Sequence, residues 1–189
     1  MNQTLFMWIA IIVISGLGTL AHFLYEASGH SRIIGLFAAV NESTWEHIKI
    51  ALTPTILWSL LDGANYGLNA NYFLAKIASL LVITFFIPIV FYSYRRLAKK
   101  SILVIDISIF YIAIILSQLT FYGILNLPSQ GFAIQYLATV ATFVFFGAYM
   151  TLTLFPQKSP IFKDPLTGKY GFLGHTHGHK ATESKRRHK

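Results

Sequence analysis

Long apolar runs, broken by short polar segments, dominate the pattern along this chain. The hydrocarbon core of a bilayer needs about 20 mostly apolar residues per helix. Five runs reach that length, at residues 4–25, 45–64, 72–94, 101–124 and 131–155. The pattern predicts an all-α integral membrane bundle of about five transmembrane helices, formed by residues 1–155.

A shorter apolar stretch, residues 33–40, lies between the first two runs. It is too short to cross a bilayer, so we expect a short interfacial or re-entrant helix there. The first run has no Lys or Arg before it and is longer than a signal-peptide core, so we interpret it as a retained helix.

Three glycines inside the runs are candidates for close contacts between helices. They are Gly16 and Gly18 in the first run and Gly147 in the last. Small residues let membrane helices approach closely, so we expect a neighbouring helix against each of them.

The composition agrees with a membrane protein. Of the 189 residues, 54% are hydrophobic and only 12% are charged, which excludes an ordinary soluble domain and a disordered chain. There is no cysteine, so disulfides, thiolate metal sites and cysteine nucleophiles are excluded as well.

The net charge of +8 becomes informative once the basic residues are located along the chain. Basic residues fill the hinge at 95–100 and the polar segment 156–189, and five helices put both on one side, together with Arg32 and Lys49. Cytoplasmic loops carry the excess of Lys and Arg, which predicts a plasma (inner) membrane protein with its N-terminus outside and its C-terminus cytoplasmic. The expected partners are the bilayer and its anionic lipid heads, not nucleic acid.

Lys76 is the one basic residue outside this group, and its run also follows Asp62. A lysine near a helix end can extend its amine outward to the interface. The simplest alternative is an ion pair between Lys76 and Asp62.

Ionisable side chains inside spans are costly and are functional candidates. His22 and Glu26 are four residues apart and share one helix face, and Asp106 lies near the start of the fourth run. Glu42, Ser43, Glu46 and His47 begin the second run. All of these map to the cytoplasmic end, so we expect them to form one shallow polar site.

Part of this group has a structural explanation. The sequence Ser43-Thr44-Trp45-Glu46 fits a capping box, in which Ser43 accepts from the N–H of Glu46 and Glu46 reaches back to the N–H of Ser43. Capping explains neither His47 nor Glu42.

The functional interpretation is a metal or acid–base site. His22, Glu26 and His47 are the expected metal ligands, because two imidazoles and one carboxylate hold zinc with one position left for water. The catalytic candidates are His47, Glu46, Ser43 and Asp106, with Glu46 or Glu26 as the partner of His47. The alternative is a set of interhelical hydrogen bonds of about 1 kcal/mol each.

Residues 156–189 form a basic, histidine-containing tail. Ile161 and Phe162 are apolar enough to dock on the membrane surface or into the bundle. His175, His177 and His179 alternate, which is compatible with metal binding or with a solvated tail.

A resemblance to a known family covers nearly the whole chain. It is carried by residues 22–26, 35–49 and 162–171, and its core is Asn41-Glu42-Ser43-Thr44-Trp45-Glu46-His47. The chain resembles a family of small prokaryotic multi-pass membrane proteins of unknown function. The resemblance implies an integral membrane protein and supplies no activity.

The chain is also similar, more distantly, to membrane hydrolases of the alkaline ceramidase type. Those proteins place Ser-x-x-x-His, a helical Asp and a late His-x-x-x-His around zinc. Ser43, His47 and Asp106 match the first two features, whereas the fifth run has no histidine and the chain has two helices fewer.

Three classes of function remain open. The broadest is a non-catalytic or regulatory membrane protein, in which caps and ion pairs satisfy residues 42–47 and no pocket opens. The second is a metal-dependent hydrolase or lipid-modifying enzyme. The third is a small-solute or ion transporter, with Asp62 and Asp106 along a cavity.

Overall fold

The protein is a bundle of five long helices, seen in a computed structural model that describes residues 2–69 and 71–175. The long helices are α1 (Gln3–Ala27), α3 (Thr44–Tyr66), α4 (Tyr72–Ala98), α5 (Leu103–Leu125) and α6 (Phe132–Leu154). Three short elements complete the described part: α2 (Arg32–Gly35), the 3₁₀ helix η1 (Pro160–Phe162) and α7 (Phe172–His175). The expected all-α class is confirmed.

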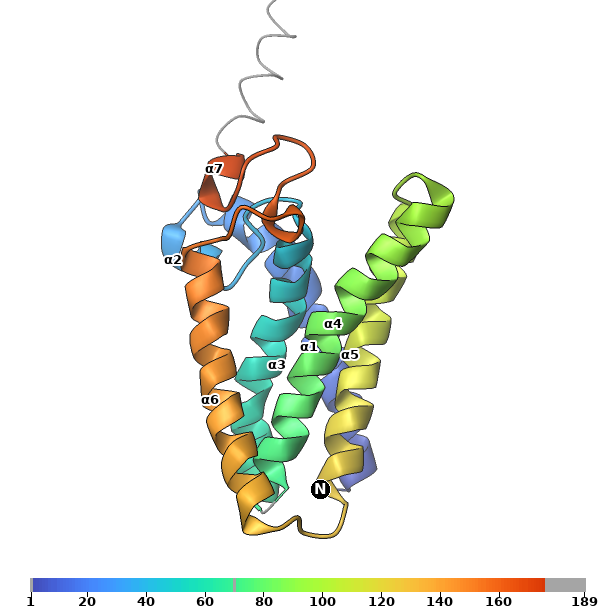
Figure 1. The fold of residues 1–189 in the computed structure, drawn as a ribbon, viewed down its shortest axis with the longest axis vertical. Coiled ribbons are helices and arrows are strands. Elements are labelled where there is room, and N and C mark those ends of the chain that lie inside the picture. The colour runs from blue at the N-terminus through green and yellow to red at the C-terminus, as the bar shows by residue number, and fades with distance from the viewer. Residues whose placement is uncertain (1, 70, 176–189) are drawn as a thin grey trace, which may run out of the picture.

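The long helices run side by side, and the connections gather at the two ends of the bundle (Figure 1). One end carries the N-terminus and the α3–α4 and α5–α6 connections. The opposite end carries α2, η1, α7 and the α4–α5 hinge, which leans away from the other helices. The hinge and the polar segment after α6 therefore lie at the same end, as five antiparallel passes require.

Helix α3 has the least apolar composition of the five. Helices α1, α4, α5 and α6 are long and apolar enough to cross a membrane; α3 is not among them. It carries Glu46, Lys49 and Asp62, and it packs against α1, α4, α5 and η1, so its polar side chains are covered by protein. The sequence pattern predicted five spans, and the composition of the helices supports four.

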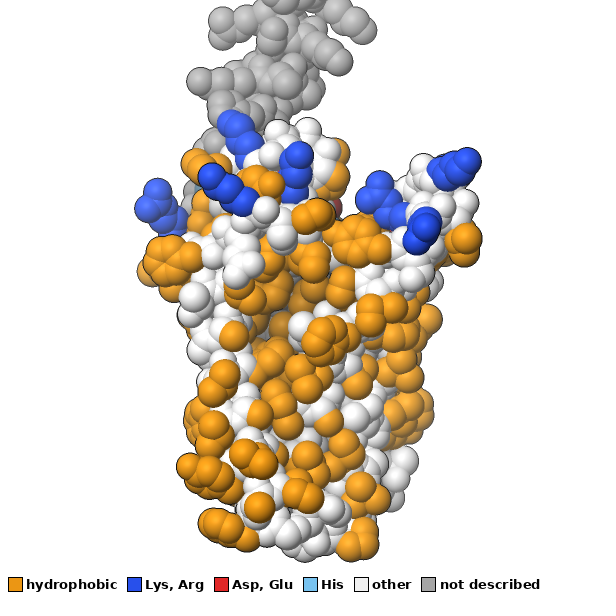
Figure 2. Space-filling model, in the orientation of Figure 1, with side chains coloured by type: hydrophobic (Ala, Val, Ile, Leu, Met, Phe, Trp, Pro, Cys, Tyr) orange, Lys and Arg blue, Asp and Glu red, His pale blue; other side chains and the backbone are white. Residues whose placement is uncertain are grey.

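The outer surface of the bundle is apolar. Large side chains such as Ile12, Leu20, Phe132 and Phe143 are more than half exposed, and apolar atoms cover most of the visible face of the long helices (Figure 2). Soluble monomers rarely expose contiguous apolar patches of this extent. Helices that face lipid satisfy their own backbone groups and present such a surface.

Asp62 and Lys76 form a buried ion pair near the α3–α4 end. Lys76 Nζ lies 2.7 Å from Asp62 Oδ2, with 1% and 0% of the two side chains exposed. The hydroxyl of Tyr122 donates to the other carboxylate oxygen at 3.2 Å. The expected pairing is confirmed, and an outward-reaching Lys76 is wrong, because the carboxylate offers a closer partner inside the bundle.

One of the three candidate glycines lies at a close contact. A Cβ on Gly18 would come within 2.6 Å of the Phe110 ring and 2.7 Å of the Ile50 carbonyl oxygen. A Cβ on Gly16 or Gly147 would meet nothing within 4 Å. The prediction is right for Gly18 and wrong for the other two, which do not face a neighbouring helix.

Two segments cover the end that carries the hinge. The stretch predicted as a short interfacial or re-entrant helix is helical only over α2, after which Ala38 and Val40 are buried. In the segment after α6, the Phe162 ring lies 5.0 Å from the Trp45 ring, so Phe162 docks into the bundle. His177 and His179 lie outside the described residues.

Candidate metal centre

The first turn of α3 is held by a network of hydrogen bonds. The side chain of Asn41 accepts from the N–H of Ser43 at 2.8 Å, and Ser43 Oγ accepts from the N–H of Glu46 at 3.4 Å. This confirms the Ser43 half of the capping box. The return half differs, because Glu46 Oε2 accepts from the N–H of Val40 at 3.0 Å instead. Glu46 thereby ties the preceding loop to α3.

Glu46 is also paired with Lys49. The two charged groups are 2.5 Å apart, and both side chains are buried. Lys49 Nζ also donates to the carbonyl oxygen of Gly35 at 2.8 Å. These contacts connect α3 to the end of α2 and occupy the Glu46 carboxylate within the fold. Lys49 is thus inside the protein rather than at its basic surface.

Three side chains from separate segments converge beside this network. His22 from α1, Glu42 from the loop before α3 and His47 from α3 each offer a ligand atom, and these atoms lie within 4.8 Å of one another. The Nε2 atoms of His22 and His47 are each 3.8 Å from Glu42 Oε2. Their imidazole rings are 5.6 Å apart. The side chains are 30% (His22), 44% (Glu42) and 36% (His47) exposed, so water reaches all three.

A backbone carbonyl group fixes the orientation of the His47 ring. Its Nδ1 lies 2.9 Å from the carbonyl oxygen of Ser43. Because a carbonyl oxygen only accepts, Nδ1 carries a hydrogen, and Nε2 is the ring atom nearer Glu42. Metal-binding histidines are commonly oriented in this way by a backbone carbonyl. The hydroxyl of Ser43 thus caps α3, and its carbonyl oxygen holds the His47 ring.

The spacing of the three groups fits a small divalent cation. Zn–N and Zn–O bonds of about 2.0–2.2 Å in tetrahedral geometry put neighbouring ligand atoms about 3.3 Å apart. Each imidazole is 3.8 Å from the carboxylate, which is about half an ångström more than this spacing, and all three ligand atoms lie within 4.8 Å of one another. Two imidazoles and one carboxylate also match the donor set of zinc sites that keep a position for water.

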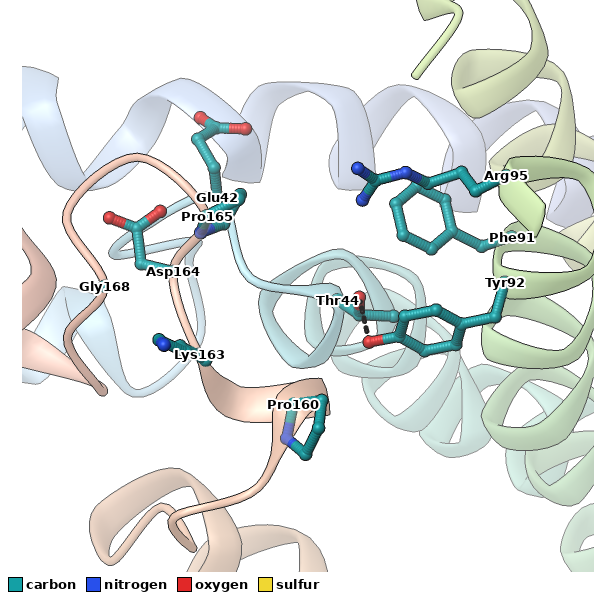
Figure 3. Close-up of a pocket in the computed structure, with 10 residues that line it drawn as sticks. All are labelled: Glu42, Thr44, Phe91, Tyr92, Arg95, Pro160, Lys163, Asp164, Pro165 and Gly168. Carbon is teal, nitrogen blue, oxygen red and sulfur yellow. Dashed lines mark hydrogen bonds between the residues drawn. The ribbon is translucent and has the colours of Figure 1, made fainter. Parts of the chain in front are cut away.

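Two clefts border this group, and Glu42 lines both. The first, of about 340 Å³, is lined by His22, Tyr25, Glu26 and the loop residues 39–42. The second, of about 350 Å³, extends from Glu42 toward α4 and the segment 160–168 (Figure 3). Two of the three candidate ligands, His22 and Glu42, thus border a cleft.

The other predicted site residues lie apart from this group. Glu26 is on the wall of the first cleft but is not one of the three converging side chains. Asp106 accepts hydrogen bonds from Tyr94 and Ser101 at the α4–α5 hinge, which leans away from α1 and α3 (Figure 1). The structure therefore brings His22 and His47 together as expected, with Glu42 in the place expected for Glu26.

The fold and the site define an all-α bundle with an apolar exterior and a His–Glu–His cluster at one end. Residues 1–172 match a family described as a family of unknown function (DUF6512), and the chain belongs to that family. No curated protein and no solved structure matches the chain. Membership agrees with the expected family of unknown function, so the activity has to be argued from the site.

Proposed function

We propose that this protein is a membrane-embedded, divalent-metal-dependent hydrolase or lipid-modifying enzyme, with His22, Glu42 and His47 as the ligands of a zinc-like ion. The observation that carries the proposal is the convergence of three ligand atoms from three segments within 4.8 Å. Their partial exposure and the adjoining cleft favour a site that exchanges with solvent over a purely structural one.

Three protein ligands leave a fourth position for water, and a bound divalent ion makes such a water a good nucleophile near neutral pH. Glu26 lines the cleft beside His22, which makes it the candidate to accept a proton from that water. Glu46 has a different role, since its carboxylate is held by Lys49 and by the N–H of Val40.

The non-catalytic interpretation accounts for only part of the segment before and within α3. Ser43 and Glu46 are satisfied by a cap and an ion pair, as that interpretation expects. Glu42 and His22, however, border open clefts. The enzyme interpretation therefore has the stronger support.

The transporter interpretation has less support. It needs Asp62 and Asp106 to line one path through the bundle. Asp62 is instead paired with Lys76, and Asp106 is hydrogen-bonded at the hinge. The position of Asp106 likewise gives no support to the resemblance to alkaline ceramidase-type hydrolases, in which a helical aspartate joins the zinc site.

We place the metal site at the cytoplasmic face of the membrane. On the visible face of the molecule, Lys and Arg side chains gather at the end that carries the hinge and the segment after α6 (Figure 2). The positive-inside rule assigns that end to the cytoplasm. The substrate would then reach the site from the cytoplasmic leaflet or from the cytoplasm.

Elemental analysis of the detergent-purified full chain, supplied with zinc and then desalted, tests the proposal. We expect one metal ion per chain in the wild type and none in His22→Ala or His47→Ala, because each change removes one of three ligands. The exposed His30 lies outside the cluster, so His30→Ala is the matched control and should keep the ion. A triple alanine variant at His175, His177 and His179 should keep it too.

Each variant is checked for a wild-type elution volume and melting temperature, so that loss of metal is not confused with loss of fold. A metal-free wild type that is folded would overturn the proposal. So would full metal content in folded His47→Ala, since two ligands would then suffice.

A further inference from the structure

The second cleft beside Glu42 is built from three parts of the chain that are remote in sequence. The α4 side supplies Phe91, Tyr92 and Arg95, the start of α3 supplies Thr44, and the segment after α6 supplies Pro160 and Lys163. The hydroxyls of Thr44 and Tyr92 lie 3.1 Å apart and join the two helices at the base of the cleft (Figure 3). We call this space the α4 cleft.

The α4 cleft is lined by two cations, Arg95 and Lys163, and by two carboxylates, Glu42 and Asp164. Within residues 2–69 and 71–175, neither Arg95 nor Lys163 takes part in an ion pair. The guanidinium of Arg95 lies 5.2 Å from the centre of the Phe91 ring and extends from α4 toward the segment that carries Glu42 and Pro165 (Figure 3). This arrangement leaves the guanidinium N–H groups available to an anion.

The acidic residues of the cleft are already engaged. Asp164 is buried, and its carboxylate accepts from the backbone N–H groups of Leu166 and Thr167 and from the Thr167 hydroxyl. Glu42 lies within 3.8 Å of both imidazoles of the candidate metal centre. Among the described residues neither carboxylate is paired with Arg95 or Lys163, so both cations stay open to an anion.

The α4 cleft also has an apolar part. Phe91, Tyr92 and two prolines line it. Beyond it, near the basic hinge, the side chains of Leu97, Leu103 and Val104 are 85%, 72% and 72% exposed. Figure 2 shows apolar side chains in the hollow between the segment after α6 and the hinge, with Lys and Arg on both rims. A ligand that fits has an anionic head and an apolar body.

We propose that the α4 cleft binds an anionic phospholipid, with its headgroup between Arg95 and Lys163, which lie on opposite sides of the cleft (Figure 3), and its acyl chains along α4. A guanidinium and an ammonium are suited to phosphate oxygens, and the cytoplasmic leaflet supplies anionic lipids. Because Glu42 lines this cleft and also belongs to the metal centre, the bound lipid is the substrate class of that centre. The lipid site stands on the geometry of the cleft, whereas the assignment as substrate rests on the proposed function.

Native mass spectrometry of delipidated full-length protein in detergent tests the lipid site. The probes are phosphatidylglycerol and phosphatidylcholine with the same acyl chains, and glycerol phosphate as the soluble headgroup. We expect preferential retention of phosphatidylglycerol by the wild type. Arg95→Gln and Lys163→Gln should each weaken that retention about tenfold, because each removes charge-assisted hydrogen bonds. Arg96→Gln and Lys158→Gln change exposed cations outside the cleft and should weaken it no more than about twofold.

Three results would overturn the lipid site. One is equal retention of the two lipids by the wild type. Another is an equal loss in all four variants, which would show a general surface charge. The third is displacement of the lipid by an equal concentration of glycerol phosphate, which would show a site for free phosphate esters.

Metal content, measured on the same preparations, separates this proposal from the proposed function. His47→Ala should lose the metal and keep the lipid preference. Arg95→Gln should keep the metal and lose the lipid preference. A wild type with metal but no lipid preference overturns the lipid site alone. A folded wild type with lipid preference but no metal overturns the proposed function and, with it, the assignment of the lipid as substrate.

Discussion

Replacement of Lys76 by methionine tests whether the buried ion pair stabilises the bundle. Lys76 Nζ is 2.7 Å from Asp62 Oδ2, and at most 1% of either side chain is exposed. The amine also lies 4.0 Å from the centre of the Phe121 ring. Methionine has a similar length and keeps most of the packing, so the main effect is the loss of the charge opposite Asp62.

Removing one partner of a buried ion pair typically costs about 3–5 kcal/mol, because an uncompensated charge remains. The hydroxyl of Tyr122 still donates to Asp62 and offsets part of that cost. We therefore expect Lys76→Met to lower the free energy of unfolding by about 3 kcal/mol. Adding Asp62→Asn removes the stranded charge, so the double variant should be less destabilised than the sum of the single changes by about 1 kcal/mol or more.

Reversible unfolding in mixed detergent micelles of increasing sodium dodecyl sulfate content, followed by circular dichroism, measures these free energies. Lys100→Met is the matched control, because Lys100 is exposed at the α4–α5 hinge. It should change the free energy of unfolding by less than about 0.5 kcal/mol. The reasoning fails if Lys76→Met is as mild as Lys100→Met, or if the effects of Asp62→Asn and Lys76→Met simply add.

Two further substitutions test the packing at the end that carries the candidate metal centre. Gly18→Ala should lower the free energy of unfolding by about 1–3 kcal/mol in the same assay, because its Cβ would meet Phe110 and the Ile50 carbonyl, whereas Gly16→Ala, with open space beside it, should not destabilise. Equal effects of the two changes would contradict the close contact. Phe162→Ala should cost about 3 kcal/mol and speed proteolysis of the segment after α6, because the ring is buried against Trp45; an unchanged cleavage rate would contradict docking through Phe162.

The parts of the site that depend on neighbours in sequence were predictable. Ser43 caps α3 because a serine before a helical run can accept from an N–H three residues on, and that geometry is local. The pair of Asp62 and Lys76 was one of two predictions for Lys76, since the two residues have opposite charges and are close in sequence, and it is confirmed. His22 and His47 were both placed at one end of the bundle by counting helix lengths.

The carboxylate of the metal centre was not predictable in the same way. Glu26 shares a helix face with His22, which made it the expected ligand. Glu42 lies in the loop before α3, where no helical spacing fixes the direction of a side chain. The loop is held by the bond from the N–H of Val40 to Glu46, and this contact helps bring Glu42 between the two imidazoles. The only sign of this role in the sequence was that helix capping does not explain Glu42.

The sequence by itself determined the number of long helices and which connections share an end of the bundle. The length of each apolar run and the rise per residue of a helix decide how many long helices the chain forms. Both are properties of the individual segment. Only the tertiary structure decided that Glu42 joins the two histidines, that Asp106 stays at the hinge and that a cleft opens beside α4. Those outcomes depend on how α1, α3, α4 and the segment after α6 pack, and that packing is set by contacts between residues far apart in the chain.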